Sequence, residues 1–306
     1  MTAAIRMSHW MRRAIVLFGF VMMVTSQEGK VKTLDLAEQA FDDQYLGCRR
    51  DTARKLEENN VLNIEKENNK NLRRAWKEAN TLWMRKKDDL KDILPQGFED
   101  DHGIALLTYT SFIRKDFSNA VKSAGKSYSS YMDDFGYKWL HFYVTTALGL
   151  LSRSKMRSNY TVYSRINDHI QVPPNGSIYV KFGHFLYTSL DEDEAALMGN
   201  NSLLIIDKYP GVSIEHFSQY PSEREVLVPG YEVFNLSLVE EEDTFMLRTT
   251  QMFCSNFNCA YIKGEKSKTS VHECMKTAAA SAASPGRMLA PGCSGLVLAL
   301  LVAALL

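Results

Sequence analysis

The sequence predicts an α+β protein in which a helical N-terminal half packs against a mostly antiparallel β-sheet in the C-terminal half. From Leu34 to Arg153, apolar residues recur among charged ones at a spacing of three to four, which is the period of an amphipathic helix. After Asn159 the pattern changes to short runs rich in β-branched and aromatic residues. No Gly/Ser-rich linker or internal repeat divides the chain, so we expect one large domain.

The N-terminus has the organisation of a secretory signal peptide. Arg12-Arg13 precede the uncharged apolar run from Ala14 to Val24, and the small residues Thr25 and Ser26 follow. An uncleaved anchor helix is the alternative, but the run is about half the roughly 20 residues that a bilayer span requires. We therefore expect residues 1–26 to be removed.

The C-terminus predicts a glycosylphosphatidylinositol (GPI) attachment signal. Small residues at Ser281 and Ala282 lead into a spacer that contains Pro285, and Gly295 to Leu306 are all apolar. A tail-anchored helix is the alternative, but the run is too short for it. We expect residues 282–306 to be removed as a propeptide, which leaves a mature domain over residues 27–281.

Composition and cysteine usage favour an extracellular protein. The 36 basic and 36 acidic residues balance, so the chain offers no strong field to attract nucleic acid. Of the five cysteines, Cys293 lies in the tail that should be removed. The others can form two disulfides in three pairings and are Cys48, Cys254, Cys259 and Cys274. Sequons for N-glycosylation fit the same compartment and lie at Asn159, Asn175, Asn200 and Asn235.

Helical stretches are predicted in the following order. The charged segment from Asp51 to Lys70 leads into an apolar stripe that we assign to the core, formed by Leu72, Trp76, Ala79 and Trp83. A second stretch runs from Gly103 to Phe117, and a third contains the apolar residues from Trp139 to Leu150.

Strands are predicted after these helices, separated by turn signals such as Pro210-Gly211 and Pro229-Gly230. The predicted strands are Thr161 to Tyr163, Ser177 to Phe182, Ser202 to Ile206, Val212 to His216, Glu225 to Val228, Tyr231 to Leu238 and Thr244 to Thr250. The histidines lack zinc-ligand spacing, and the sequence has no Gly-rich phosphate loop and no Gly-x-Ser-x-Gly elbow. We therefore expect no metal centre, no Rossmann cofactor site and no serine hydrolase.

The candidate catalytic feature is Glu223-Arg224-Glu225, directly ahead of an apolar run. On an extended segment, side chains alternate with period two, so we expect both carboxylates on one face. Such a pair can divide labour, because one carboxylate steadies developing positive charge while the other orients or deprotonates a nucleophile. The alternative is a solvated strand end, since charged residues mostly lie on surfaces.

Short motifs between Ala40 and Cys274 carry a family resemblance. They are Phe41 to Cys48, His102 to Thr110, Phe182 to Leu190, Glu225 to Phe234 and Asn256 to Cys259. In order and spacing they resemble the vertebrate ecto-ADP-ribosyltransferase family, whose GPI-anchored or secreted members transfer ADP-ribose from NAD to a protein arginine. Within the family the chain is most similar to the arm that includes the Dombrock blood-group carrier.

The resemblance implies an ADP-ribosyltransferase domain with a helical half over residues 27–157 and a β-sandwich-like catalytic half over residues 158–275. NAD would be the substrate that donates ADP-ribose, with NADP as an alternative, and no metal would take part. The acceptors would be arginine side chains of extracellular target proteins. The protein would be a monomer at the cell surface, held on the membrane by its GPI anchor.

The resemblance also implies roles for individual residues. Glu225 would hydrogen-bond the nicotinamide ribose and stabilise the oxocarbenium-like centre. Glu223 would orient the acceptor guanidinium, which is a poor nucleophile because it stays protonated. Thr188 and Ser189 would hold the catalytic glutamate in place.

Tyr109 and Ser222 would lie beside NAD, although a helix-packing tyrosine and a loop serine are equally good interpretations.

Two further positions depart from the family pattern. The family reads Val-Tyr-Arg on its first catalytic strand, whereas here Ser164 intervenes, so Arg165 would face the NAD diphosphate only if a bulge or turn re-aims it. Tyr187 replaces the first serine of the family's Ser-Thr-Ser strand and would crowd the nicotinamide pocket.

The resemblance pairs Cys48 with Cys259, a bond that closes a long loop and should stabilise the fold by about 4 kcal/mol. It leaves Cys254 to pair with Cys274. Because of the departures at Arg165 and Tyr187, two alternatives to an active transferase remain: a family member limited to NAD hydrolysis, and a glycosylated surface antigen without activity.

Overall fold

The computed structural model describes residues 31–154, 156–172, 177–239, 243–267 and 269–282. The predicted signal peptide over 1–26, residues 283–306 of the predicted propeptide and the sequon at Asn175 lie outside these residues. The domain boundaries therefore stay predictions. Within the described ranges, no helix has both the length and the apolar character to span a bilayer.

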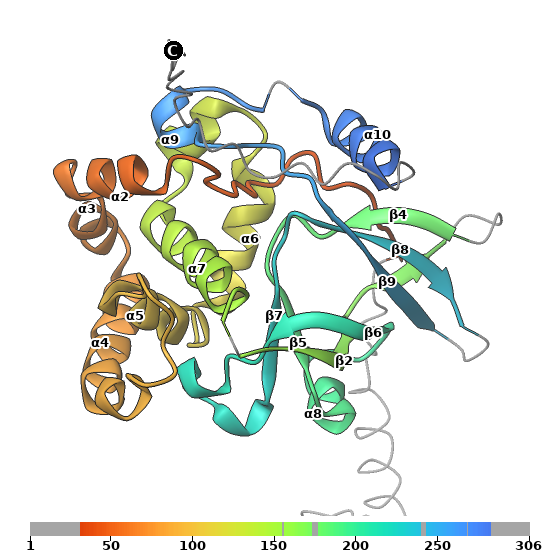
Figure 1. Ribbon diagram of the computed structural model, residues 1–306, viewed down its shortest axis with the longest axis horizontal. Helices are drawn as coiled ribbons and strands as arrows, with labels where there is room; N and C mark the ends of the chain where they lie inside the picture. The colour runs from red at the N-terminus through yellow and green to blue at the C-terminus, as the bar shows by residue number, and fades with distance from the viewer. Residues whose placement is uncertain (1–30, 155, 173–176, 240–242, 268, 283–306) are drawn as a thin grey trace, which may run out of the picture.

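The α+β class is confirmed, with α2 to α7 on one side of the molecule and the sheet on the other, where α8 and α10 also lie (Figure 1). The helices of the N-terminal half are α2 (Arg49–Glu58), α3 (Val61–Asn68), α4 (Lys70–Leu90), α5 (Asp100–Tyr109), α6 (Arg114–Ala124), η1 (Ser130–Asp134) and α7 (Lys138–Leu151). The helices of the C-terminal half are α8 (Glu192–Ala196), η2 (Glu215–Phe217), η3 (Pro221–Glu223), α9 (Ala260–Lys263) and α10 (Val271–Ala282).

The core of the helical half forms where α4 crosses α5. The predicted stripe on α4 packs inward, with Leu72, Ala79 and Trp83 buried and Trp76 half-buried against them. Gly103 allows this close approach, because a Cβ there would lie 2.5 Å from the Trp83 ring. The eight residues from His102 to Tyr109 on α5 are buried, so this helix is the centre of the half.

The prediction of one helix from Gly103 to Phe117 is wrong, because α5 ends at Tyr109 and α6 begins at Arg114. The hydroxyls of Thr110 and Ser111 donate to the carbonyl oxygens of Leu107 and Thr108, at 3.2 and 2.7 Å. Side-chain bonds of this kind compete with the helical backbone ladder. The resulting turn brings Tyr109 and Arg114 close to one another.

The strands of the C-terminal half form one seven-stranded sheet with the order β4-β8-β9-β6-β2-β5-β7. Neighbouring strands are antiparallel except β6 and β9, which are parallel, while β1 and β3 form a separate parallel pair. The strands are β1 (Val31–Thr33), β2 (Arg157–Arg165), β3 (His169–Gln171), β4 (Ser177–Lys181), β5 (Leu186–Ser189), β6 (Leu203–Val212), β7 (Glu225–Val228), β8 (Glu232–Leu238) and β9 (Thr244–Phe253). An isolated bridge from Ser213 to Val226 brings the chain after β6 back to β7.

The predicted strand from Val212 to His216 and the predicted turn at Pro210-Gly211 are wrong. β6 continues through Pro210 to Val212, and the 3-10 turn η2 follows. β6 pairs with β9 only from Leu203 to Ile206. Beyond that point one side of the strand is unpaired, so the missing N–H of Pro210 is tolerated.

The segment from Leu34 to Gly47 is not helical, contrary to the periodicity, because hydrogen bonds hold it extended against the C-terminal half. The Asp43 carboxylate accepts from the backbone N–H groups of Tyr45, Cys259 and Ala260, at 2.7, 2.9 and 2.7 Å. The first helix of the half begins only after Cys48.

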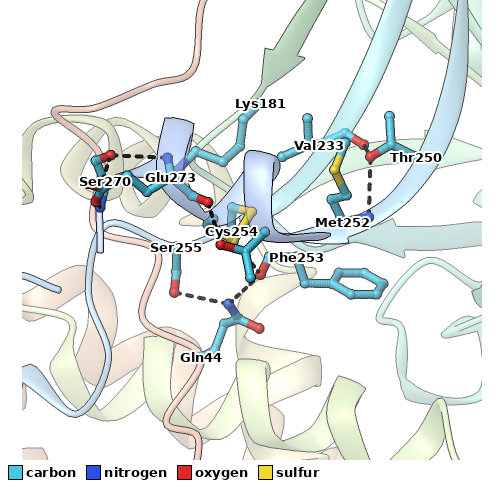
Figure 2. The surroundings of a disulfide bond; sticks show 12 residues. Gln44, Lys181, Val233, Thr250, Met252, Phe253, Cys254, Ser255, Ser270 and Glu273 are labelled. Carbon is cyan, nitrogen blue, oxygen red and sulfur yellow. Dashed lines mark hydrogen bonds between the residues drawn. A yellow bond between two sulfur atoms is a disulfide. The ribbon is translucent and has the colours of Figure 1, made fainter. Parts of the chain in front are cut away.

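Both implied disulfides are present. Cys48 bonds Cys259, which ties the start of α2 to α9. Cys254, directly after β9, bonds Cys274 on α10. Figure 2 shows the surroundings of the second bond, where Gln44 donates to Ser255 Oγ at 3.0 Å. The N-terminal segment therefore meets the chain beside both bonds.

Candidate active site

The two acids of the Glu-x-Glu pair converge, but not through strand alternation. Glu223 ends the 3-10 turn η3, Arg224 adopts the left-handed conformation with φ 46° and ψ 47°, and Glu225 begins β7. The prediction of an extended segment is therefore wrong at this point. The left-handed residue turns the chain between the acids, so that both Oε2 atoms approach Nη2 of Arg114, at 3.5 Å from Glu223 and 3.1 Å from Glu225.

Arg114 was not foreseen from the sequence. It is the first residue of α6, and its guanidinium lies 3.9 Å from the ring centroid of Tyr187 and 5.5 Å from that of Tyr109. A basic residue at a helix start is normally a surface residue, and the helix dipole disfavours a cation there. The apolar periodicity predicted one helix from Gly103 to Phe117, which includes Arg114, and so gave no signal for this residue.

Strand β5 fixes the backbone of the two acids. Ser189 pairs with Glu225 in the β5–β7 ladder, and its hydroxyl donates to the carbonyl oxygen of Glu223 at 2.7 Å. The Thr188 hydroxyl donates to the carbonyl oxygen of Val226. Both hydroxyl residues are buried, so they position the acids through the main chain.

Burial dominates the electrostatics of the pair. It raises the pKa of Glu225 to about 7, and Glu223 adds to the rise while Arg114 opposes it. Burial works most strongly against the charge of Arg114, but Glu225, Tyr109 and Tyr187 together outweigh it, so the pKa of Arg114 lies above its usual value. Burial also raises the pKa of Tyr109 and Tyr187, so both phenols are neutral donors at physiological pH.

A cavity of about 770 Å³ lies next to the acids, between the helical half and the sheet. Its volume is in the range of about 300–1,000 Å³ that is typical of small-molecule sites. Four of the predicted site residues are on its wall, and these are Tyr109, Arg165, Tyr187 and Glu223. Arg114 lies there too, together with the cations Lys32, Lys115 and Lys122. A wall with this excess of positive charge suits an anionic ligand such as a diphosphate.

Comparison with known proteins assigns the family. The model of the NAD:arginine ADP-ribosyltransferase family matches residues 34–252. The chain belongs to this family. Among curated relatives of this ADP-ribosyltransferase, ecto-ADP-ribosyltransferase 5 of Bos taurus is 37% identical over 254 residues, which are 78% of this chain and 77% of the relative. Ecto-ADP-ribosyltransferase 3 of Homo sapiens is 33% identical, with 84% of this chain and 66% of the relative covered.

Solved structures of the family share the fold. A glutamate-to-alanine mutant of the mono-ADP-ribosyltransferase ART2.2 in complex with NADH has a TM-score of 0.65 and 34% identity, and the match covers 75% of this chain and 99% of that chain. A glutamate-to-isoleucine mutant in complex with NAD has a TM-score of 0.63 and 35% identity, with the same coverage. The predicted family and fold are thereby confirmed.

Arg165 of this family member reaches the cavity wall without a bulge next to it. The β2–β6 register is regular from Val162 to Arg165, and the irregularity lies earlier, between Tyr160 and Val162. β2 ends at Arg165, and this last residue of the strand belongs to the cavity wall. Its Nη1 donates to the carbonyl oxygen of Asn201 at 2.9 Å.

Several polar atoms of the site are buried without a hydrogen-bond partner among the described residues: Glu225 Oε1, Tyr109 Oη, Arg114 Nε and Arg165 Nε. Buried polar groups of native proteins are normally paired, so such a cluster points to a ligand. Ser222 is exposed on η3 and is absent from the described wall of the cavity. The part of the chain that the structure describes holds no group of side chains that could bind a metal.

Proposed function

We propose that this protein transfers ADP-ribose from NAD to arginine side chains of target proteins at the outer cell surface and releases nicotinamide. One observation carries the proposal: Glu223 lines a cationic cavity, Glu225 meets Glu223 at Arg114 on the cavity wall, and Glu225 keeps one oxygen unpaired among the described residues. A hydroxyl of the nicotinamide ribose is the kind of donor that this oxygen lacks.

Glu225 stabilises the positive charge that develops on the ribose as the bond from C1′ to the nicotinamide nitrogen breaks. Nicotinamide leaves with the electron pair of that bond. Glu223, whose side chain is 27% exposed, orients the acceptor guanidinium and takes its proton as a guanidinium nitrogen bonds C1′. Ser189 and Thr188 hold the two acids at the required spacing through the backbone.

The cationic wall serves the dinucleotide. Arg165 and Lys115 supply positive charge towards the diphosphate. The buried Tyr109 hydroxyl, which has no partner in the described part of the chain, supplies a neutral donor on the same wall. Ser222 makes no contribution in this proposal, because it lies outside that wall.

The experiment is incubation of the glycosylated ectodomain with labelled NAD and poly-arginine. Label on poly-arginine is the expected result. Free ADP-ribose without labelled acceptor would reduce the function to NAD hydrolysis. No turnover together with no binding of NAD in calorimetry would leave a surface protein without chemistry.

We also propose that the mature chain is a monomer held by a GPI anchor attached near Ser281. The terminal apolar run supports the anchor. Phosphatidylinositol-specific phospholipase C should release the protein from intact cells, and the released form should elute at the mass of one chain. Retention on the cells after treatment would reject the anchor.

A further inference from the structure

The catalytic acid is covered by an arginine of the same chain. Glu225 is 0% exposed, while its partner Arg114 is 18% exposed and lies on the cavity wall. Glu225 itself is absent from the described wall. Arg114 therefore stands between the carboxylate and any ligand in the cavity.

Arg114 carries the same chemical group as the acceptor. Its Nη2 contacts Glu225 at 3.1 Å and Glu223 at 3.5 Å, and Glu223 is the residue that the proposed function assigns to the incoming guanidinium. Its guanidinium carbon lies over the Tyr187 ring, 3.9 Å from the ring centroid. Planar stacking on an aromatic ring and pairing with carboxylates are the interactions by which a guanidinium is bound.

The Arg114 pairing is incomplete. Its Nε and the Oε1 atom of Glu225 are buried and have no partner within the described ranges. Its position at the N-terminus of α6 is electrostatically unfavourable for a cation. A guanidinium held by incomplete pairing at an unfavourable helix position can be displaced by one that pairs better.

We propose that Arg114 is a resident guanidinium in the acceptor site, which an acceptor arginine must displace before transfer, so that Arg114 determines acceptor affinity. The inference rests on the proposed function for the role of Glu223, and it goes further by assigning the acceptor position and its competitor. Free arginine side chains bind weakly while Arg114 is in place. A target protein binds better when contacts elsewhere on its surface add to the affinity.

The test uses agmatine, a small guanidino compound, and two variants of the glycosylated ectodomain. Arg114→Gln removes the guanidinium and the charge. Arg114→Lys keeps the charge beside Glu225 but lacks the planar fork. In calorimetry without NAD, the affinity for agmatine should be at least about tenfold higher in both variants than in the wild type. In the wild type Arg114 occupies the site most of the time, and the apparent affinity falls in proportion to the fraction of molecules whose site is free.

Steady-state transfer to agmatine supplies the second readout. The KM for agmatine should fall in both variants in the same proportion, and the KM for NAD should change much less. In Arg114→Lys the pH profile should stay that of the wild type. If Arg114→Gln does not fold, as judged by circular dichroism, the lysine variant carries the test alone.

Arg54→Gln is the matched control. Arg54 also pairs with two carboxylates, Asp51 at 3.0 Å and Glu58 at 3.3 Å, but it is 57% exposed on α2. This control should leave the agmatine affinity unchanged.

Equal agmatine affinity in the wild type and both variants would overturn the inference. So would a fall in kcat with an unchanged KM for agmatine and a pH profile displaced to higher pH in Arg114→Gln, because Arg114 would then only keep Glu225 ionised. If no form of the protein consumes NAD, yet the variants bind agmatine more tightly, the proposed function fails and the inference stands.

Discussion

Two buried ion pairs of this protein differ in how completely they are satisfied. Asp42 and Lys181, both 0% exposed, form one pair at 2.5 Å. The second Asp42 oxygen accepts from the Asn256 N–H at 2.7 Å. In the other pair, between Arg114 and Glu225, one oxygen and one nitrogen have no partner in the described structure. The first pair joins the N-terminal segment to β4, and the second lies at a cavity.

The difference separates a structural site from a chemical one. A buried polar cluster whose atoms are all paired rigidifies the fold, whereas unpaired atoms carry a free-energy cost of about 1–3 kcal/mol each. A ligand that pairs with those atoms recovers that cost. The Asp42 pair is therefore complete within the chain, whereas the Glu225 cluster leaves two polar atoms for a ligand, which in the proposed function is the substrate.

Asp42→Ala should give the largest effect on stability. It leaves Lys181 buried and unpaired, and breaking such a pair costs about 3–5 kcal/mol. Urea unfolding of the ectodomain measures the loss. Asp51→Ala, which removes an exposed carboxylate on α2, should cost less than about 1 kcal/mol. Similar losses in the two variants would contradict the structural role of the Asp42 pair.

Glu225→Gln should give the largest effect on chemistry. Removal of the charge that faces the reacting ribose should lower both transfer and hydrolysis by about 10²–10³-fold. Its unfolding free energy should fall by less than that of Asp42→Ala, because glutamine keeps the shape and no longer carries a buried charge. If Glu225→Gln lowers the unfolding free energy as much as Asp42→Ala does, the Glu225 pair is as important for stability as the Asp42 pair, and the distinction between them is wrong.

Glu223→Gln should separate the two reactions. Glutamine cannot take the proton of the acceptor guanidinium, so transfer to poly-arginine should be lost, while some NAD hydrolysis persists because water needs less activation. High-performance liquid chromatography of labelled ADP-ribose measures the hydrolysis. Equal loss of both activities would show that the two acids do not divide their roles.

Acidification below about pH 7 should lower kcat. In the proposed function Glu225 acts as an anion, and burial raises its pKa to about 7, with Arg114 lowering it and Glu223 raising it. Its anionic fraction, and with it kcat, should fall about tenfold for each pH unit below that value. The neighbouring phenols Tyr109 and Tyr187 stay neutral over this range because burial raises their pKa. A kcat that stays unchanged over about two pH units below the pKa of Glu225 would contradict the requirement for an ionised Glu225.

The sequence predicted the elements that depend on periodic patterns and missed those that depend on single residues. The stripe on α4 was predicted because regular spacing marks a buried face, and the strand Glu225 to Val228 because a short apolar run ends at the turn signal Pro229-Gly230. The break between α5 and α6 depends on hydroxyl groups that bond their own backbone, which no periodicity reports.

The site was predicted in part for the same reason. The acid pair and the positions of Thr188 and Ser189 could be mapped from the family resemblance, and each lies close to the acids as that mapping implied. Arg114 could not be foreseen, because its importance comes from a long-range contact with Glu225, 111 residues away. The place of Arg165 on the cavity wall could not be predicted, because the sequence does not show that β2 ends at this residue.

Tyr187→Ser should give the smallest effect on activity, and it directly tests the contact between Tyr187 and Arg114. The Tyr187 ring lines the cavity, and its centroid lies 3.9 Å from the guanidinium carbon of Arg114, so a serine should widen the pocket and remove a cation–π contact of about 0.5–2 kcal/mol. We expect transfer to poly-arginine to rise a few-fold, with a lower KM for the acceptor. The matched variant Tyr187→Phe keeps the ring and the stacking and should leave the rate near that of the wild type. An unchanged or lower rate in Tyr187→Ser would show that the ring supports the site instead of crowding it, and that Arg114 is held by its two carboxylates alone.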